Sequence, residues 1–328
     1  MNQERAIGWV AHPHMRCGEA LSSWLARYAW ANGLSPHSFT RTTFGEVAVW
    51  NRDIDRSVTA EMLRTAGRLP GATKVQLAAS VMNSYAGNVF GCEFISAPFI
   101  PWITPAGVYH RIRRHHGTAY CPMCLRDYGY SRLAWRLAWM VHCPRHERPL
   151  LDACPKCDAP FVFHRMAAEA RGALLCINCG YDITRATACR PVTMGARQLQ
   201  RALTCCAGGH PRIVGNSTVT ALEFATGVRT LAKGLFPNAQ LEGLVGGLRS
   251  SLRAHLDRPI SGLEGPLESW RIEDRAVALA YLTEVLKDWP ETILKCLRIA
   301  RVCPSRFADK RMPPWVAEVL RRRSGIKC

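Results

Sequence analysis

The sequence predicts a mainly α-helical protein with tandem zinc ribbons at its centre. Two amphipathic helical patterns joined by a short turn lie near the start of the chain. Paired cysteine and histidine residues fill a central stretch, and helical patterns return after it. We therefore expect three domains: a helix-turn-helix-like helical bundle at 1–115, a tandem zinc-binding module with short β-hairpins at 116–190, and a helical domain at 191–328.

The expected N-terminal helices follow from apolar spacing and from capping residues. Residues 18–33 place leucine, tryptophan and tyrosine side chains on one face at helical spacing. Ser35 suits the N-cap and Pro36 the first position of a second helix. Two shorter helices at 59–67 and 73–84 complete the predicted bundle.

The first two helices have the pattern of a helix-turn-helix, in which the second helix, at 36–44, enters a DNA groove. A plain αα-hairpin satisfies the same pattern, so both interpretations stay open. In the first, the second helix offers polar side chains to DNA: His37, Ser38, Thr40, Arg41 and Thr42. The basic linker before the zinc module either tracks a phosphate backbone or is simply solvated. The candidate DNA contacts are His37, Arg41, Arg111, Arg113 and Arg114.

Four knuckles in the central module have the spacing of metal ligands. In each, two residues separate the paired ligands, so both side chains can turn onto one cation. Eighteen residues separate the two knuckles of each ribbon, which is zinc-ribbon spacing. We predict two structural sites and two Zn²⁺ ions per chain. The first ligand set is Cys121, Cys124, Cys143 and His146; the second is Cys154, Cys157, Cys176 and Cys179.

Other uses of these ligands fit the sequence less well. His146 cannot join a disulfide, and it stands farther from Cys154 than a RING-type cross-brace places its histidine. In a cross-brace, the first knuckle would share its ion with the third. A catalytic zinc would keep a water in place of one protein ligand. His142, next to Cys143, is an alternative metal ligand at the second knuckle.

Residues 130–139 of the first ribbon alternate aromatic, leucine and arginine residues. Their i, i+4 pairs predict a helix packed over the zinc site, with the tryptophans in the core rather than stacked on nucleic acid. Beyond residue 190 the periodicity predicts further helices, at 195–203, 217–235, 241–255, 272–288 and, in the tail, 315–328.

The composition favours a globular protein with a polyanionic partner. Apolar residues make up 48% of the chain and the formal charge is +18, which two filled zinc sites would lower to about +15. An excess of this size favours nucleic acid through counterion release, although an ordinary basic surface gives the same count. No membrane span or signal peptide is evident, and zinc-spaced cysteines indicate a reducing cytoplasm.

Catalytic motifs are absent from the sequence. The segment nearest to a nucleotide-binding P-loop has the wrong spacing, and no carboxylate cluster suits Mg²⁺-dependent strand transfer. No nucleophilic triad stands out once the metal ligands are set aside. We therefore expect a protein that is not an enzyme.

The order of motifs resembles the TniQ family of transposition proteins, which is related to TnsD. The segments that carry the resemblance are GEALSSWL, YCPMCL, HCPRHERPLLDACPKC and CINCGYDI, followed by Asp288-Trp-Pro near the end. The resemblance spans most of the chain, and the zinc stretch is its most specific part. Ala20 departs from the family, which usually has serine after Gly-Glu, and the helix prediction is unaffected.

The resemblance implies an adaptor that helps choose the insertion site and recruits an AAA+ transposition ATPase. Some relatives recognise DNA directly, others bind an RNA-guided effector complex, and homodimers occur. Two further hypotheses remain: a sequence-specific transcription regulator using the same helix-turn-helix and ribbons, and a zinc-dependent enzyme. A regulator binds a defined operator tightly without an ATPase, whereas an adaptor binds DNA more tightly with one.

Overall fold

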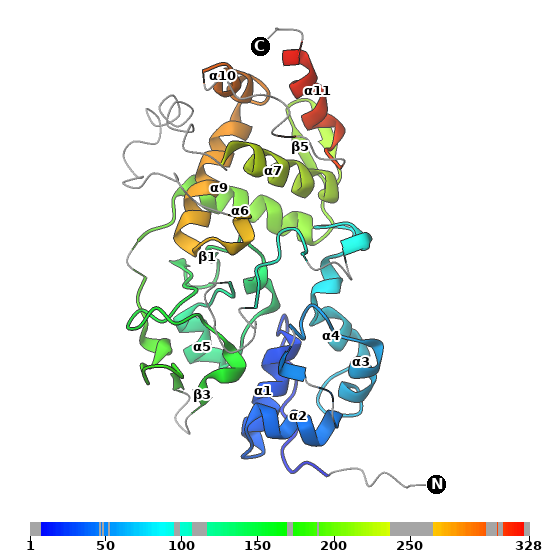
Figure 1. The fold of residues 1–328 in the computed structure, drawn as a ribbon, viewed down its shortest axis with the longest axis vertical. Helices are drawn as coiled ribbons and strands as arrows, with labels where there is room; N and C mark the ends of the chain where they lie inside the picture. Colours follow the sequence, from blue (N-terminus) through cyan, green and yellow to red (C-terminus); the bar gives the residue numbers. More distant parts are fainter. Residues whose placement is uncertain are drawn as a thin grey trace. The chain divides into compact units, whose positions relative to one another are not determined.

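The structure is a computed structural model, drawn in Figure 1. It describes residues 8–45, 47, 49–51, 53–94, 99–106, 117–168, 173–188, 190–236, 265–299, 307 and 311–324. Contacts divide the chain into two compact units. The first comprises Met1–Ser84, Pro105–Leu137 and Leu151–Thr187; the second comprises Tyr85–Thr104, Ala138–Leu150 and Ala188–Cys328. The three-domain division stays a prediction, because contacts group segments without showing which of them fold alone.

The first unit is built from short helices and 3₁₀ turns. Its α-helices are α1 (Leu21–Ala31), α2 (Pro36–Phe44), α3 (Ala60–Ala66), α4 (Lys74–Ala79) and α5 (Pro122–Tyr128). Its 3₁₀ turns are η1 (Val49–Asn51), the start of η2 (Met82–Tyr85), η4 (Leu133–Arg136), η5 (Phe163–Arg165) and η6 (Ile183–Arg185). One antiparallel hairpin pairs β3 (Ala167–Ala168) with β4 (Leu174–Leu175), with Ala167 opposite Leu175.

The predicted helix starts in this unit are confirmed by their caps. The hydroxyl of Ser35 accepts the backbone N–H of Ser38, and α2 begins at proline as expected. Thr59 caps α3 in the same way. Thr73 and Gln76 form a reciprocal capping box at α4.

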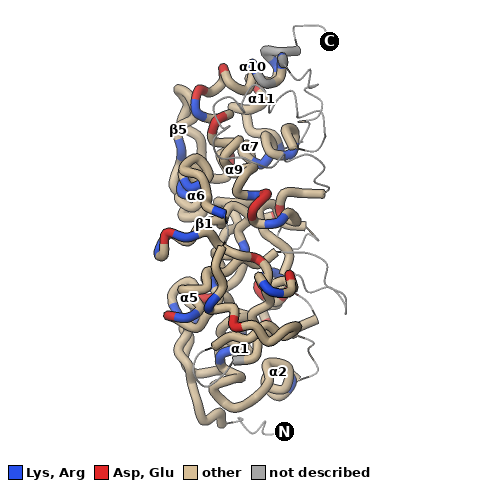
Figure 2. Tube along the Cα trace, turned by 90° about the vertical axis from the view of Figure 1, so that its left-hand side faces the viewer, with Lys and Arg blue, Asp and Glu red and all other residues tan. Residues whose placement is uncertain are grey.

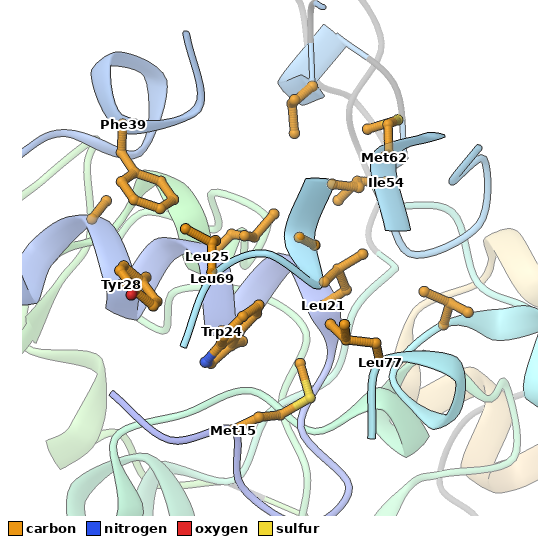
Figure 3. Close-up of a cluster of buried hydrophobic side chains, with 14 of the residues drawn as sticks. Met15, Leu21, Trp24, Leu25, Tyr28, Phe39, Ile54, Met62, Leu69 and Leu77 are labelled. Atoms are coloured by element: carbon orange, nitrogen blue, oxygen red, sulfur yellow. The ribbon is translucent and has the colours of Figure 1, made fainter. Parts of the chain in front are cut away.

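One apolar core holds α1 to α2, α3 and α4. Figure 3 shows Trp24, Leu25 and Tyr28 of α1 beside Phe39 of α2. All four side chains are completely buried, and the rings of Tyr28 and Phe39 stack with centroids 5.2 Å apart. Burying a side chain of this size stabilises the fold by about 2–3 kcal/mol. The apolar face predicted for the first helix is therefore the face that forms the core.

The predicted helix at 130–139 is wrong. This segment contains only the 3₁₀ turn η4, and Leu137 after it is extended. Its backbone is paired with a distant part of the chain: the N–H of Leu133 donates to Gly18, and Ser131 accepts the N–H of Ala20. These non-local bonds replace the i→i−4 bonds of a helix. The expected burial is confirmed, since Trp135 and Trp139 are at most 1% exposed.

The second unit carries the longer helices. These are α6 (Met194–Ala207), α7 (Ala221–Leu235), α9 (Ile272–Lys287), α10 (Glu291–Ile299) and α11 (Pro314–Ser324). Its 3₁₀ turns are η3 (Cys92–Phe94) and η7 (Leu267–Ser269), with Tyr85 ending η2. Its two hairpins are antiparallel: β1 (His142–Cys143) with β2 (Arg148–Pro149), and β5 (Arg212–Val214) with β6 (Ser217–Val219).

Helix α7 begins later than the sequence predicts. Residues 217–219 are strand β6, and the helix starts at Ala221 with a capping box between Thr220 and Glu223. Gly215 adopts a positive φ of 57° at the turn of the β5–β6 hairpin, which sequence periodicity did not reveal. The helix predicted at 241–255 lies outside the described residues.

Polar contacts lock the helices of this unit together. The hydroxyl of Thr283 on α9 donates to the carbonyl of Gly195 on α6 at 2.7 Å. The indole of Trp102 donates to Ala225 on α7 at 2.9 Å.

Within the described part of the chain, no helix is long and apolar enough to cross a membrane.

Candidate metal centres

The structure brings the eight predicted metal ligands into two clusters. In the first, ligand atoms of Cys121, Cys124, Cys143 and His146 all lie within 4.8 Å of one another. Cys121 is the N-cap of α5, and its sulfur accepts the N–H of Cys124 at 3.5 Å. Because proline follows Cys121, the helix starts at once and turns both thiols to the same side.

The second cluster collects Cys154, Cys157, Cys176 and Cys179 within the same limit of 4.8 Å. Two hydrogen-bonded turns build it. The N–H of Asp158 donates to the backbone carbonyl of Cys154 at 2.9 Å, and the N–H of Gly180 donates to the backbone carbonyl of Cys176 at 2.8 Å. The β3–β4 hairpin lies between these two knuckles in the chain.

Left-handed residues close three of the four knuckles. Glu147, Asp158 and Gly180 each follow the second ligand of a knuckle and have φ values of 47°, 57° and 69°. This conformation turns the chain back after the ligand pair, and glycine adopts it without strain at position 180. The remaining knuckle instead continues into α5, which ends at the left-handed Gly129.

The spacing of the ligand atoms fits a tetrahedral zinc ion. In the second cluster the sulfurs of Cys154 and Cys179 are 3.6 Å apart, and those of Cys157 and Cys176 are 3.7 Å apart. Four thiolates bound at 2.3 Å to one tetrahedral ion stand about 3.8 Å apart. A disulfide needs about 2.05 Å. The cysteines are free, so the distances match ligands of one cation.

The same test holds for the first cluster. Nδ1 of His146 lies 3.7 Å from the sulfur of Cys143. A nitrogen at 2.0–2.1 Å and a sulfur at 2.3 Å on one tetrahedral ion stand about 3.6 Å apart. Three thiolates and one imidazole complete a four-coordinate set with no position left for water, which is the composition of a structural zinc site.

The pKa values of the thiols differ within the second cluster. Burial raises the pKa of Cys154 to about 12 and also raises that of Cys176. Burial has the same raising effect on Cys157, but hydrogen bonds, first that from Asn178, lower its pKa to about 6. Several thiolates held this close together repel one another unless a divalent ion neutralises them, so metal binding drives the release of their protons.

The grouping of the side chains is sequential. The first and second knuckles form one cluster and the third and fourth form the other, whereas a cross-brace would bring the first and third together. His142 belongs to neither cluster. Its Nε2 lies 3.9 Å from Glu147, and burial lowers its pKa, so it is a buried neighbour of the site.

The predicted DNA contacts on α2 have mixed outcomes. His37 and Arg41 are exposed, as a DNA contact requires. Thr40 is only 3% exposed, and its hydroxyl donates to the carbonyl of Pro36 in its own helix at 2.9 Å. It therefore cannot reach a base. Arg111, Arg113 and Arg114 lie outside the described residues.

Two residues between the third and fourth knuckles, His164 and Arg165, lie near His37 of α2, and no pattern in the sequence pointed to them. The ring of His164 in η5 stacks on Trp50 with centroids 4.2 Å apart and lies 6.3 Å from the ring of His37. Partial burial, and next the positive charge of Arg165, lower the pKa of His37. Arg165 thus adds a cation beside His37.

A comparison with family models finds a match for the first part of the chain. Residues 10–150 match the TniQ model. This stretch is similar to TniQ domains. The match includes α1, α2 and all four ligands of the first cluster. It supports, for residues 10–150, the resemblance that the motifs carry.

The TniQ match ends before the second cluster begins at Cys154. The resemblance expected over most of the chain is thus confirmed for 10–150 alone. No curated protein matches the sequence. The second cluster and the helices of the second unit are accordingly interpreted from their own residues.

Proposed function

We propose that this protein is a TniQ-family, non-enzymatic, zinc-binding adaptor of DNA transposition. It helps select the target site and recruits an AAA+ transposition ATPase. The match of residues 10–150 to the TniQ model is the observation that carries the proposal. The ligands of the first cluster lie inside this domain, so the metal belongs to the same part of the chain as the family match.

The composition of the clusters supports a structural role for two Zn²⁺ ions. Each cluster offers four protein ligands, which satisfies tetrahedral zinc and leaves no site for a reacting water. The ions would hold the knuckles in place and leave the surrounding side chains free for partners. A protein built in this way acts by binding other molecules rather than by transforming them.

DNA contact through α2 is part of the proposal. His37 and Arg41 are exposed on this helix, and Arg165 lies next to His37. These groups suit the phosphates and base edges of a groove. The target component is either DNA contacted in this way or an RNA-guided effector complex. Binding of the isolated protein to its target DNA separates the two.

Recruitment of the ATPase tests the function directly. The purified protein, its cognate ATPase and a nucleotide are mixed with target DNA, and ATPase bound to that DNA is measured. We expect more bound ATPase, placed near the target, when the protein is present. Neither ATP hydrolysis nor DNA cleavage or joining is expected from the protein alone. ATPase loading that is the same with and without the protein would refute the adaptor function.

A transcription regulator is the second candidate, favoured by the exposed polar edge of α2. It predicts tight binding of the isolated protein to one operator, with no increase when the ATPase is added. The adaptor predicts weak binding alone and tighter binding with the ATPase and nucleotide.

A further inference from the structure

The second unit carries a basic surface that is separate from α2. It consists of Arg145 and Arg148 in the β1–β2 hairpin and of Arg197 and Arg201 on α6, and we call it the arginine face. Residues 138–150 and 194–207 contain these four arginines, no lysine and a single carboxylate, that of Glu147. Figure 2 shows basic positions along α6 and beside β1.

A buried glutamine holds the hairpin against α6. Oε1 of Gln200 accepts the N–H groups of Val141 and His142, each at 2.9 Å, and its Nε2 donates to the carbonyl of His142 at 2.7 Å. Gln200 is 4% exposed, so water does not compete for these bonds. The hairpin and the helix are therefore fixed to each other by three short hydrogen bonds.

The arginines lie along this fixed contact. Arg197 reaches the hairpin, where its guanidinium is 3.3 Å from the carboxylate of Glu147. Arg201 is four residues further on and so lies on the same side of α6. Arg145, Arg148 and Arg201 are exposed, and the side chain of Arg197 is 25% exposed. Arg148 and Arg201 are therefore exposed cations on either side of the contact between the hairpin and α6, and Glu147 is the one carboxylate within these two segments.

Such a surface favours a polyanion. Guanidinium groups bind phosphate oxygens through paired N–H donors, and neutralising phosphates releases condensed counterions. The two segments offer no exposed tryptophan, tyrosine or phenylalanine ring for unpaired bases, because Trp139, the one such residue that they contain, is completely buried. Single strands are usually held by such stacking. A duplex backbone needs only the charges.

We propose that the arginine face binds the phosphate backbone of duplex DNA without regard to sequence. It would hold DNA beside the target while another part of the protein or its partner selects the site. The identity of the polyanion as DNA rests on the proposed function in transposition. The surface itself rests on the arginines and on their attachment through Gln200.

The test uses the full-length, zinc-loaded protein and the double variant Arg148→Ala/Arg201→Ala. Its affinity for a short duplex of random sequence is measured by fluorescence anisotropy from about 50 to 200 mM salt. Loss of two phosphate contacts should lower the slope of log K against log salt by about 2. The wild-type affinity should consequently fall about tenfold more than that of the variant over this range.

Two matched variants accompany it. Lys295→Ala/Arg298→Ala removes two exposed cations from α10 of the same unit and should leave the slope unchanged. Arg148→Lys/Arg201→Lys keeps the charge and should retain most of the wild-type slope. Zinc content and circular dichroism are measured for each variant. If the double alanine variant fails to fold, the single variant Arg201→Ala carries the test, with an expected change in slope of about 1.

A slope equal to that of the wild type in Arg148→Ala/Arg201→Ala would overturn the proposal. So would a change seen only with RNA of the same length. The ATPase recruitment assay is run in parallel to separate the two ideas. A lower slope without recruitment would leave the arginine face in place and refute the adaptor. Recruitment with an unchanged slope would refute DNA binding by the arginine face and leave the adaptor function in place.

Discussion

Glu19 and Arg27 form an ion pair at 2.8 Å in which the carboxylate side chain is completely buried. The same carboxylate accepts the N–H of Arg16 and the hydroxyl of Ser23, each at 2.9 Å. The oxygen of Ser23 in turn accepts the N–H of Ser131, which follows α5 of the first knuckle. A single buried network thus joins α1 to the segment that leaves the first knuckle.

Removing the Glu19 carboxylate should be strongly destabilising. Glu19→Ala leaves the guanidinium of Arg27 and two further donors without their acceptor, which costs about 3–5 kcal/mol. Denaturant unfolding measures the loss. The control is Arg126→Ala, which breaks the exposed pair with Asp127 and should cost at most about 1 kcal/mol. Equal losses in the two variants would show that the buried network contributes nothing special.

Each zinc cluster should lose its ion separately. Cys176→Ser should lower the zinc content by about one ion per chain, since one thiolate of the four is removed. The helices of the second unit should survive, and elemental analysis with circular dichroism tests both statements. A wild-type protein with one zinc or none would contradict the two-site account.

Cys121→Ser should have a wider effect than Cys176→Ser. It also removes about one zinc, and it loosens the first knuckle, from which the chain continues to Ser131. Ser131 forms backbone hydrogen bonds to Ala20, just before α1, and to the hydroxyl of Ser23 in α1, so both bonds should weaken. Hydrogen exchange of α1 measures this effect. Faster exchange in Cys121→Ser than in Cys176→Ser is expected, and the reverse order would contradict the connection.

Asp55 should make stability depend on pH. Burial, and next the carboxylate of Asp53, raise its pKa to about 6, although Arg136 opposes the shift. The folded protein therefore binds this proton more tightly than the unfolded chain, whose pKa is near 3.8. The free energy of unfolding therefore falls by about 3 kcal/mol as the pH rises from about 4 to 6. This loss persists at higher pH.

Asp55→Asn should remove this pH dependence. Unfolding free energies of the variant and the wild type are compared from pH 4 to 7. The difference should shift in favour of the variant as the pH rises, because the amide carries no charge to bury. Zinc ligands titrate in both proteins and cancel in the comparison. Parallel curves would show that Asp55 titrates normally.

Arg41 should contribute to sequence preference if α2 enters a DNA groove. Arg41→Ala should lower the affinity for the target duplex by about 1–3 kcal/mol, with a smaller effect on random DNA. Thr40→Val is the matched control on the same helix, because its buried hydroxyl bonds only to α2 itself. Competition binding with target and random duplexes measures the preference. Equal losses on both duplexes would reduce Arg41 to a phosphate contact.

Local signals predicted much of the fold and of the metal centres. The start of α2 follows from Ser35 and Pro36, whose effect is confined to neighbouring residues. The two ligands of each pair lie within a single turn. The number of residues between pairs in the sequence favoured the sequential arrangement over the cross-brace, and the clusters have that grouping. Side chains that act within a few residues of themselves are visible to sequence analysis.

Non-local pairing accounts for what was missed. Residues 130–139 have helical spacing, but Leu133 bonds to Gly18 instead of to its own turn. The buried guanidinium of Arg136 donates to Asp53 at 2.9 Å across a long stretch of chain. The approach of His164 to Trp50 and His37 likewise joins distant segments. No periodicity or spacing in the sequence predicts these contacts between distant segments.

The most direct test of the adaptor function is the distribution of insertion sites in cells that carry the transposase and the ATPase. Insertions are mapped with the wild-type protein, without the protein, and with Cys121→Ser. The account predicts that insertions concentrate at a preferred target only with the wild-type protein, and become rare or scattered in the other two cases. An unchanged distribution and frequency without the protein, together with tight operator binding by the isolated protein, would contradict it and establish a regulator.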